Sequence, residues 1–81
     1  MPQLILYSTA YCSLCDKALD LVIGLPAAAG MQLEVMDIAH DNGLLERYGD
    51  RIPVFRVGNK ELQAPIDANG LTKFLAAVES A

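Results

Sequence analysis

The stretch that decides the fold runs from Gln3 to Cys15 and reads QLILYSTAYCSLC. Its first part, up to Ser8, is short, apolar and bounded by polar residues, which favours a buried β-strand. Its last part holds two cysteines separated by two residues, Cys12 and Cys15. From there to Leu25 apolar residues recur at three- and four-residue intervals, the period of a helix. We therefore expect a strand that leads into a helix, with the cysteine pair where the helix begins.

The next part of the chain predicts a second strand and a second helix. Pro26 lies where the first helix is expected to kink or end. Polar and apolar residues alternate over Gln32–Ile38, which predicts a strand buried on one face. Asp41 then fits the N-cap of a short helix that ends at Gly49. A strand, a helix and a strand in this order form a βαβ unit, whose two strands are parallel.

The last third of the chain predicts two more strands and a helix. Pro53–Val57 is interpreted as a strand with proline at its first position, where a missing N–H breaks no ladder bond. A turn at Gly58-Asn59 then leads into an antiparallel strand over Lys60–Gln63. Apolar residues at helical spacing predict a final helix that begins near Asp67 or Asn69. The expected fold is α/β, in the order βαβαββα, with a four-stranded mixed sheet flanked by helices.

Length and charge limit what the protein can be. The 81 residues suffice for a single domain, 1–81, and the apolar share of 53% can fill its core. A net charge of −4 without a basic cluster argues against binding to nucleic acid or to anionic membranes. No apolar run approaches the roughly 18 residues of a membrane span, and no signal peptide is visible. We expect a monomeric, cytoplasmic protein.

The cysteine spacing predicts thiol chemistry. A disulfide across so short a loop would stabilise the fold little, so stapling does not explain the pair. A thiol at a helix N-terminus has a lowered pKa, because unpaired N–H groups and the helix dipole favour the thiolate. We expect this lowering to be modest at Cys12, since Asp16 adds negative charge to the first turn. Cys15, one turn deeper, is placed to attack a mixed disulfide on Cys12.

Other uses of the cysteines are less well supported by the sequence. A closed zinc site needs four Cys or His ligands, and the chain offers Cys12, Cys15 and His40, so we predict no metal site within one chain. Two inert structural thiols remain an alternative. His40 is expected on the surface before the second helix and is given no role.

At this point the sequence resembles a known family. Residues 6–15 are similar to the first strand and active-site opening of glutaredoxins and thioredoxins, and Arg51-Ile52-Pro53-Val54 supports the match. The likeness extends from about Leu4 to the last helix and is greatest to small bacterial glutaredoxin-like proteins. It implies a thioredoxin-like fold.

The resemblance also implies a binding groove beside Cys12. In that superfamily a cis-proline precedes the third strand and faces the cysteine pair, so the Ile52–Pro53 peptide bond is expected to be cis. The backbone of Ile52 would then pair with an extended disulfide or glutathione substrate. Tyr11 is interpreted as a lip of this groove, with plain core packing as its alternative.

Two departures from the family concern glutathione. Glutaredoxins usually carry Lys shortly before the first cysteine, where this chain has Thr9. They also carry Gly-Gly and acidic residues near the last helix, where this chain has Glu61 to Asp67, reading ELQAPID. Contacts to glutathione are therefore not implied.

The expected function is that of a thiol–disulfide oxidoreductase or redox carrier, acting through Cys12 and Cys15 by a mixed disulfide. No bound cofactor is expected. Glutathione or a flavoprotein reductase would supply electrons, and the substrate would be a disulfide-containing protein or a small thiol compound. Two alternatives stay open: a homodimer that holds an iron–sulfur cluster or metal through Cys12 of each copy, and a non-catalytic thioredoxin-like adaptor that binds a peptide near Pro53.

Overall fold

The chain follows the predicted order of strands and helices. The structure, a computed structural model, describes residues 3–79. Its elements are β1 (Gln3–Ser8), α1 (Ser13–Ile23), η1 (Pro26–Ala28), β2 (Gln32–Asp37), η2 (Ile38–His40), α2 (Asn42–Tyr48), β3 (Val54–Val57), β4 (Lys60–Gln63) and α3 (Ala68–Glu79). The two short 3₁₀ helices, η1 and η2, are the only elements in this part of the chain that the sequence pattern did not predict.

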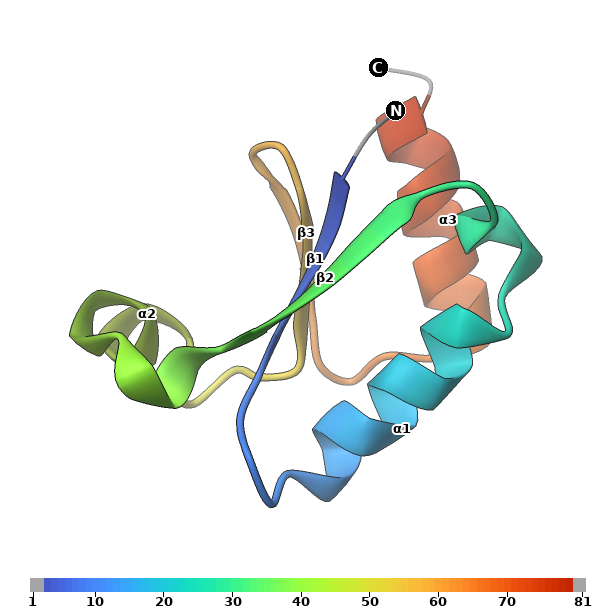
Figure 1. Cartoon of the computed structure of the whole chain (residues 1–81). Coiled ribbons are helices and arrows are strands. Elements are labelled where there is room, and N and C mark those ends of the chain that lie inside the picture. Colours follow the sequence, from blue (N-terminus) through green and yellow to red (C-terminus); the bar gives the residue numbers. More distant parts are fainter. Residues whose placement is uncertain (1–2, 80–81) are drawn as a thin grey trace.

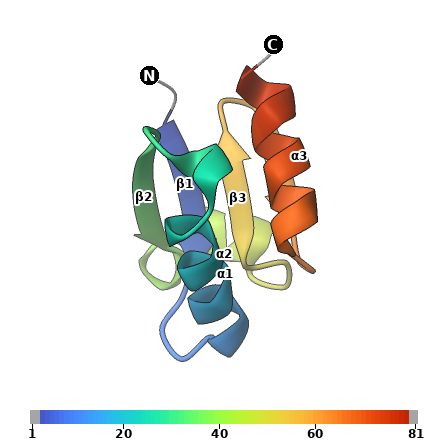
Figure 2. The same ribbon diagram turned by 90° about the vertical axis from the view of Figure 1, so that its right-hand side faces the viewer.

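The four strands form one mixed sheet in the order β2-β1-β3-β4. β1 pairs parallel with β2 and antiparallel with β3, and β3 pairs antiparallel with β4. α1 and α3 lie on one face of this sheet, and α2 lies on the other (Figures 1 and 2). The expected α/β fold, a mixed sheet flanked by helices, is confirmed.

Two hydrophobic cores lie on the two faces of the sheet, and β1 contributes to both. Leu4 and Leu6 are fully buried on the face covered by α1 and α3, where they pack with Phe55. Tyr7 points to the other face and packs against Tyr48 of α2. Successive side chains of a strand point to opposite faces, so an uninterrupted apolar run fits a strand that is covered on both sides.

The strand β2 is less buried than its alternating pattern predicted. Leu33 and Val35 share the face of the sheet on which α1 lies, yet they remain 38% and 47% exposed. β2 is an edge strand, and the helices on that face leave its side chains partly open. Alternation shows which residues share a face, but it does not show whether another element covers that face. The expectation of a strand buried on one face was therefore wrong for these two residues.

The helix boundaries follow the predicted caps. The carboxylate of Asp41 accepts a hydrogen bond from the Leu44 N–H at 3.0 Å, and Gly49 follows the last residue of α2. The carboxylate of Asp67 accepts one from the Gly70 N–H at 2.6 Å at the start of α3. Each bond satisfies a backbone donor that the first turn of a helix leaves unpaired. No helix within residues 3–79 is long and apolar enough to cross a membrane.

Replacing Leu71 by alanine tests the core between α3 and the sheet. Leu71 is fully buried, so Leu71→Ala should lower the free energy of unfolding by about 2–5 kcal/mol. Leu45→Ala is the matched control, because Leu45 is also helical but 46% exposed, and it should cost at most about 1 kcal/mol. Urea unfolding followed by circular dichroism measures both. Equal losses in the two variants would contradict the assigned core.

Candidate functional site

Cys12 and Cys15 lie at the junction of β1 and α1, joined by a disulfide. Their Cα atoms are 5.2 Å apart, which is within the usual range for a bridged pair. Cys12 is the N-cap of α1, with extended backbone angles, and Cys15 is three residues further on, inside the helix. The structure thus brings together the two residues on which the sequence hypothesis depends.

The sulfur of Cys12 takes the position that an oxygen usually holds in a helix cap. The Cys15 N–H donates a hydrogen bond to the Cys12 Sγ at 3.1 Å, and the Asp16 N–H donates to the Cys12 carbonyl oxygen at 3.1 Å. The N–H groups at this helix end carry partial positive charge. After reduction of the disulfide, the Cys15 N–H and the positive end of the helix dipole would stabilise a thiolate on Cys12 more than a neutral thiol.

The two sulfurs differ in how accessible they are. Cys15 is 1% exposed, whereas Cys12 is only partly buried. A molecule that approaches from solvent therefore reaches Cys12 before Cys15. The first turn of α1 adds one acidic side chain, Asp16.

Tyr11, the residue directly before Cys12, projects into solvent. Its exposure of 106% shows that it belongs to neither hydrophobic core. Its backbone has φ +61°, a left-handed conformation that costs a non-glycine residue about 1 kcal/mol or more. Within residues 3–79 no other non-glycine residue has a positive φ. The alternative of plain core packing for Tyr11 is wrong.

The loop before β3 lies beside the first turn of α1. Pro53 is buried and lines the same pocket as Leu14, which lies between the two cysteines. The Ile52–Pro53 peptide bond is cis. The Ile52 N–H donates to the Tyr48 carbonyl oxygen at 3.1 Å, so this N–H is already engaged within the chain. The Pro53 carbonyl oxygen accepts from the Ala64 N–H at 3.2 Å.

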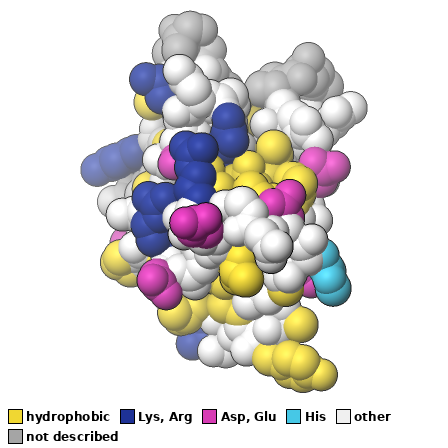
Figure 3. Space-filling model, turned by 90° about the vertical axis from the view of Figure 1, so that its left-hand side faces the viewer, with side chains coloured by type: hydrophobic (Ala, Val, Ile, Leu, Met, Phe, Trp, Pro, Cys, Tyr) yellow, Lys and Arg dark blue, Asp and Glu magenta, His cyan; other side chains and the backbone are white. Residues whose placement is uncertain are grey.

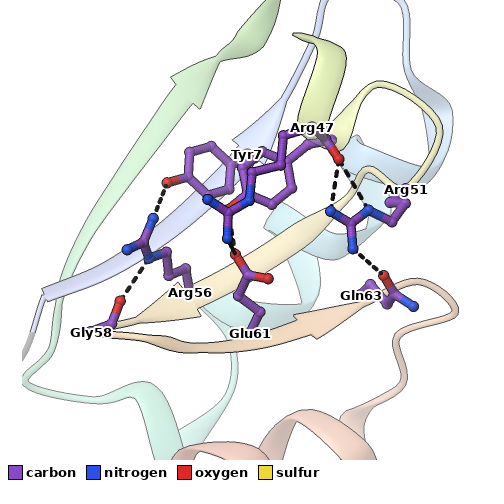
Figure 4. Close-up of polar contacts among 8 residues, drawn as sticks. Tyr7, Arg47, Arg51, Arg56, Gly58, Glu61 and Gln63 are labelled. Carbon is purple, nitrogen blue, oxygen red and sulfur yellow. Dashed lines mark hydrogen bonds and ion pairs between the residues drawn. The ribbon is translucent and has the colours of Figure 1, made fainter. Parts of the chain in front are cut away.

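A set of polar contacts holds this loop against α2 and β4 (Figure 4). The guanidinium of Arg51 donates to the Arg47 carbonyl oxygen, at 3.1 Å from Nε and 2.7 Å from one terminal nitrogen. The other terminal nitrogen donates to the side chain of Gln63 at 3.4 Å. The Arg51 N–H also donates to the Tyr48 carbonyl oxygen at 2.8 Å. Because Arg51 is two residues before Pro53, these bonds position the proline.

Beneath the arginines, two tyrosines stack on the sheet. The rings of Tyr7 and Tyr48 have centroids 4.4 Å apart and an angle of 16° between their planes. The Tyr48 hydroxyl donates to the carboxylate of Glu61, and Arg56 donates to the Tyr7 hydroxyl at 3.3 Å. Burial, followed by this bond to Glu61, raises the pKa of Tyr48 above its ordinary value. Lys and Arg side chains gather on this face, with Asp and Glu among them (Figure 3).

With this geometry in place, the comparisons with known proteins identify the family. The family described as "Glutaredoxin-like domain (DUF836)" matches residues 3–76. The chain belongs to this family. A comparison with curated proteins found no match.

Solved structures of bacterial proteins share the fold. The X-ray structure of XcR50 from X. campestris is 37% identical, covers 91% of this chain and 96% of its own, and has a TM-score of 0.80. The solution structure of that protein gives a TM-score of 0.77 at 37% identity, covering 93% of this chain and 94% of its own. Protein Ne2328 from Nitrosomonas europaea is 26% identical, with coverage of 90% and 89% and a TM-score of 0.74.

These comparisons confirm the resemblance and the thioredoxin-like fold. A glutaredoxin-like domain with a Cys-x-x-Cys pair bonded as a disulfide supports a role in thiol redox chemistry. The site residues expected from the sequence come from two segments that the fold brings to one end of the sheet. The junction of β1 and α1 supplies Tyr11, Cys12 and Cys15, and the loop before β3 supplies Ile52 and Pro53.

Sequence reasoning assigned no role to a third segment at this end of the sheet. Ala64, Pro65 and Ile66 line the pocket together with Leu14 and Pro53, and the Ala64–Pro65 bond is also cis. The sequence pattern of the β3–β4 hairpin could have predicted where this segment lies. With a two-residue turn between β3 and β4, Val54 pairs with Gln63. The next residues outward, Pro53 and Ala64, must then lie opposite each other.

Tyr48→Phe tests the hydrogen bond between α2 and β4. The substitution keeps the stacked ring but removes the hydrogen bond to Glu61, so it should lower the free energy of unfolding by about 1 kcal/mol at pH 8. The raised pKa means that the fold favours the neutral phenol. The contribution of Tyr48 is therefore complete below its ordinary pKa and is lost as the pH rises through the raised one.

Urea unfolding of wild type and Tyr48→Phe from pH 8 to pH 11 measures this contribution. The difference between the two free energies should shrink at the alkaline end. A difference that stays constant or grows with pH would contradict the assignment.

Proposed function

We propose that this glutaredoxin-like domain is a thiol–disulfide oxidoreductase or redox carrier, with Cys12 as nucleophile and Cys15 as resolving thiol. One observation carries the proposal. The Cys12 Sγ caps α1, accepts the Cys15 N–H at 3.1 Å and is partly exposed, while its disulfide partner is buried. This arrangement favours attack by one sulfur from the surface and resolution by the other from inside.

In the reductive direction the reaction has two exchange steps. The Cys12 thiolate attacks a substrate disulfide, forms a mixed disulfide and releases the first substrate thiolate. The Cys15 thiolate then attacks the Cys12 sulfur, forms the Cys12–Cys15 disulfide and releases the second substrate thiolate. Two electrons pass from the protein to the substrate, and the protons of the two cysteine thiols end on the two released thiolates through solvent.

The protein is then reduced again by the reverse exchange. Two molecules of glutathione, or the dithiol of a flavoprotein reductase, supply two electrons and two protons and leave as a disulfide. A compartment that keeps thiols reduced, such as the cytoplasm, suits this direction. In this proposal Tyr11 and Pro53 border the bound substrate. Ile52 offers its carbonyl oxygen, since its N–H is engaged by Tyr48.

Equilibration in glutathione buffers of known potential tests the proposal. Trapping of thiols followed by mass spectrometry should show reversible two-electron oxidation of the dithiol to the disulfide. The midpoint potential should lie between about −120 and −270 mV. Cys15→Ser should accumulate a glutathione adduct on Cys12, because no resolving thiol remains. Cys12→Ser should accumulate far less, because Cys15 is 1% exposed.

Equal adducts in the two variants would contradict the assigned roles of the cysteines. A dithiol that stays reduced throughout the glutathione series would contradict the proposed function. If the protein instead acts as an adaptor, changing both cysteines to serine should leave binding of its partner intact.

The reactivity of Cys12 with iodoacetamide tests the role of the helix cap. The pKa of Cys12 in the reduced protein should lie modestly below the free-thiol value of about 8.5, because backbone N–H groups stabilise the thiolate while Asp16 opposes it. Asp16→Asn should lower this pKa further. Alkylation rates from pH 5 to pH 10 give the midpoints, and a wild-type midpoint at or above that of free cysteine would refute the cap argument.

A further inference from the structure

The outer side of β2 is an open edge of the sheet (Figure 2). β2 pairs with β1 in a continuous register over Gln32–Asp37, and no strand within residues 3–79 pairs with its other side. An open edge presents backbone N–H and C=O groups that can pair with another strand, and proteins usually protect it with proline, a bulge or charged side chains. β2 contains no proline, and its only charged residues are Glu34 and Asp37. This edge is therefore weakly protected against pairing.

Apolar side chains lie beside this edge, on the face of the sheet that α1 covers. Leu33 and Val35 of β2 are half-exposed, and Ile23 at the end of α1 is 69% exposed. Leu33 and Ile23 also line an open apolar hollow of about 440 Å³, to which Met31 contributes. An apolar patch of this kind next to an unpaired strand favours a partner that adds a strand and covers the patch with its own apolar side chains.

A second copy of β2 fits this edge in an antiparallel register centred on Leu33. Residues directly opposite each other in an antiparallel pair have their side chains on the same face of the sheet. Leu33 would face Leu33 of the second copy, and Val35 would face Met31, which lines the hollow on the same face as Leu33. On the other face, Glu34 would face Gln32, whose side-chain amide can donate a hydrogen bond to the carboxylate. Apolar groups thus meet apolar groups, and no two carboxylates meet.

The neighbouring registers fit less well. A centre at Glu34 would place two carboxylates directly opposite each other, which is destabilising. A centre one residue further along would place Leu33 opposite Asp37, and a centre at Gln32 would pair much of β2 with residues that precede the strand. The Gln3 side chain already donates to Glu34 at 3.3 Å, but a carboxylate can accept several hydrogen bonds. The side chains of β2 therefore favour the register centred on Leu33.

We propose that two copies of this chain associate by antiparallel pairing of their β2 strands, which joins the two sheets into one. The inference does not depend on the proposed function. Leu33 pairs with Leu4 near the start of β1, whereas Cys12 follows the end of β1, so the two cysteine pairs stay accessible at opposite ends of the joined sheet. A dimer differs from the monomer expected from the sequence, because the open face of β2 is visible only in the fold.

Sedimentation equilibrium of the oxidised protein tests the association. In this form Cys12 and Cys15 are bonded within one chain, so neither an intermolecular disulfide nor a cluster held through Cys12 contributes to the mass. The mean mass should rise from 8.7 kDa toward twice that value as the protein is concentrated from micromolar to millimolar levels. A protein that stays at the monomer mass would overturn the inference and leave the surface to an extended segment of a different protein.

Three lysine variants with the same added charge test the register. Gln32→Lys should lower the dissociation constant of the dimer about threefold or more relative to Leu45→Lys, because each lysine faces Glu34 of the other copy. Leu33→Lys should raise it at least about tenfold, because two ammonium groups replace two leucines at the symmetry axis. Leu45→Lys is the matched control, since Leu45 is 46% exposed but lies on α2, and it measures the effect of the added charge alone.

Gln32 keeps the test valid if Leu33→Lys does not fold, because Gln32 is polar and exposed. Gln32→Glu should weaken the dimer, since it places carboxylates opposite each other at both Glu34 pairs. Circular dichroism establishes that each variant is folded. Equal dissociation constants in the three lysine variants would overturn the inference, and so would weaker association of Gln32→Lys than of Leu45→Lys.

Discussion

The burial of β1 on both faces is the constraint on which the rest of the structure depends. α1 and α3 cover one face of the sheet and α2 packs on the other, so both sets of side chains on β1 must be apolar. Leu4 and Leu6 supply one core, and Tyr7 supplies the other. Because the chain passes from this strand into α1 within five residues, the packing of β1 also determines where the cysteine pair lies relative to the sheet.

The difference between the two cysteines follows from the period of the helix. The buried residues of α1 are Cys15, Ala18 and Val22, which are spaced by three and four residues and form one stripe. Cys15 is the first member of the stripe that packs α1 against the sheet. Cys12 precedes the helix as its cap and has no place in the stripe. Two cysteines three residues apart at the start of a helix therefore differ in burial: the first lies at the surface and the second in the core.

Local sequence patterns were sufficient to predict the helices and strands, but not how deeply each one is buried. The periods of apolar residues, the caps at Asp41 and Asp67, and the Gly58-Asn59 turn predicted every strand and helix within residues 3–79, apart from the short 3₁₀ helices. The exposure of Val35 was missed because it depends on what another element covers. The fold and the cysteine pair could therefore be predicted from local sequence.

The contacts that complete the candidate site depend on distant parts of the chain. Tyr7 and Tyr48 stack although 41 positions separate them in the sequence, and each alone resembles any core aromatic. The pocket residues Ala64 and Pro65 carry no reactive group, so no chemical motif singles them out. Their position could be predicted only from the register of the β3–β4 hairpin, which places Ala64 opposite Pro53.

The site thus draws on two parts of the fold that can vary independently. A thiolate on Cys12 would depend on the Cys15 N–H at the start of α1, which is present whatever residues lie between the cysteines as long as the helix forms. The pocket depends on the first turns of α1 and on Pro53, Ala64, Pro65 and Ile66 at the base of the β3–β4 hairpin. A change at Pro65 would alter the wall next to the dithiol while leaving the Cys12 cap intact. The cysteine pair and the apolar wall beside it are therefore determined by separate parts of the sequence, and Leu14 is the residue between the two cysteines that also lines that wall.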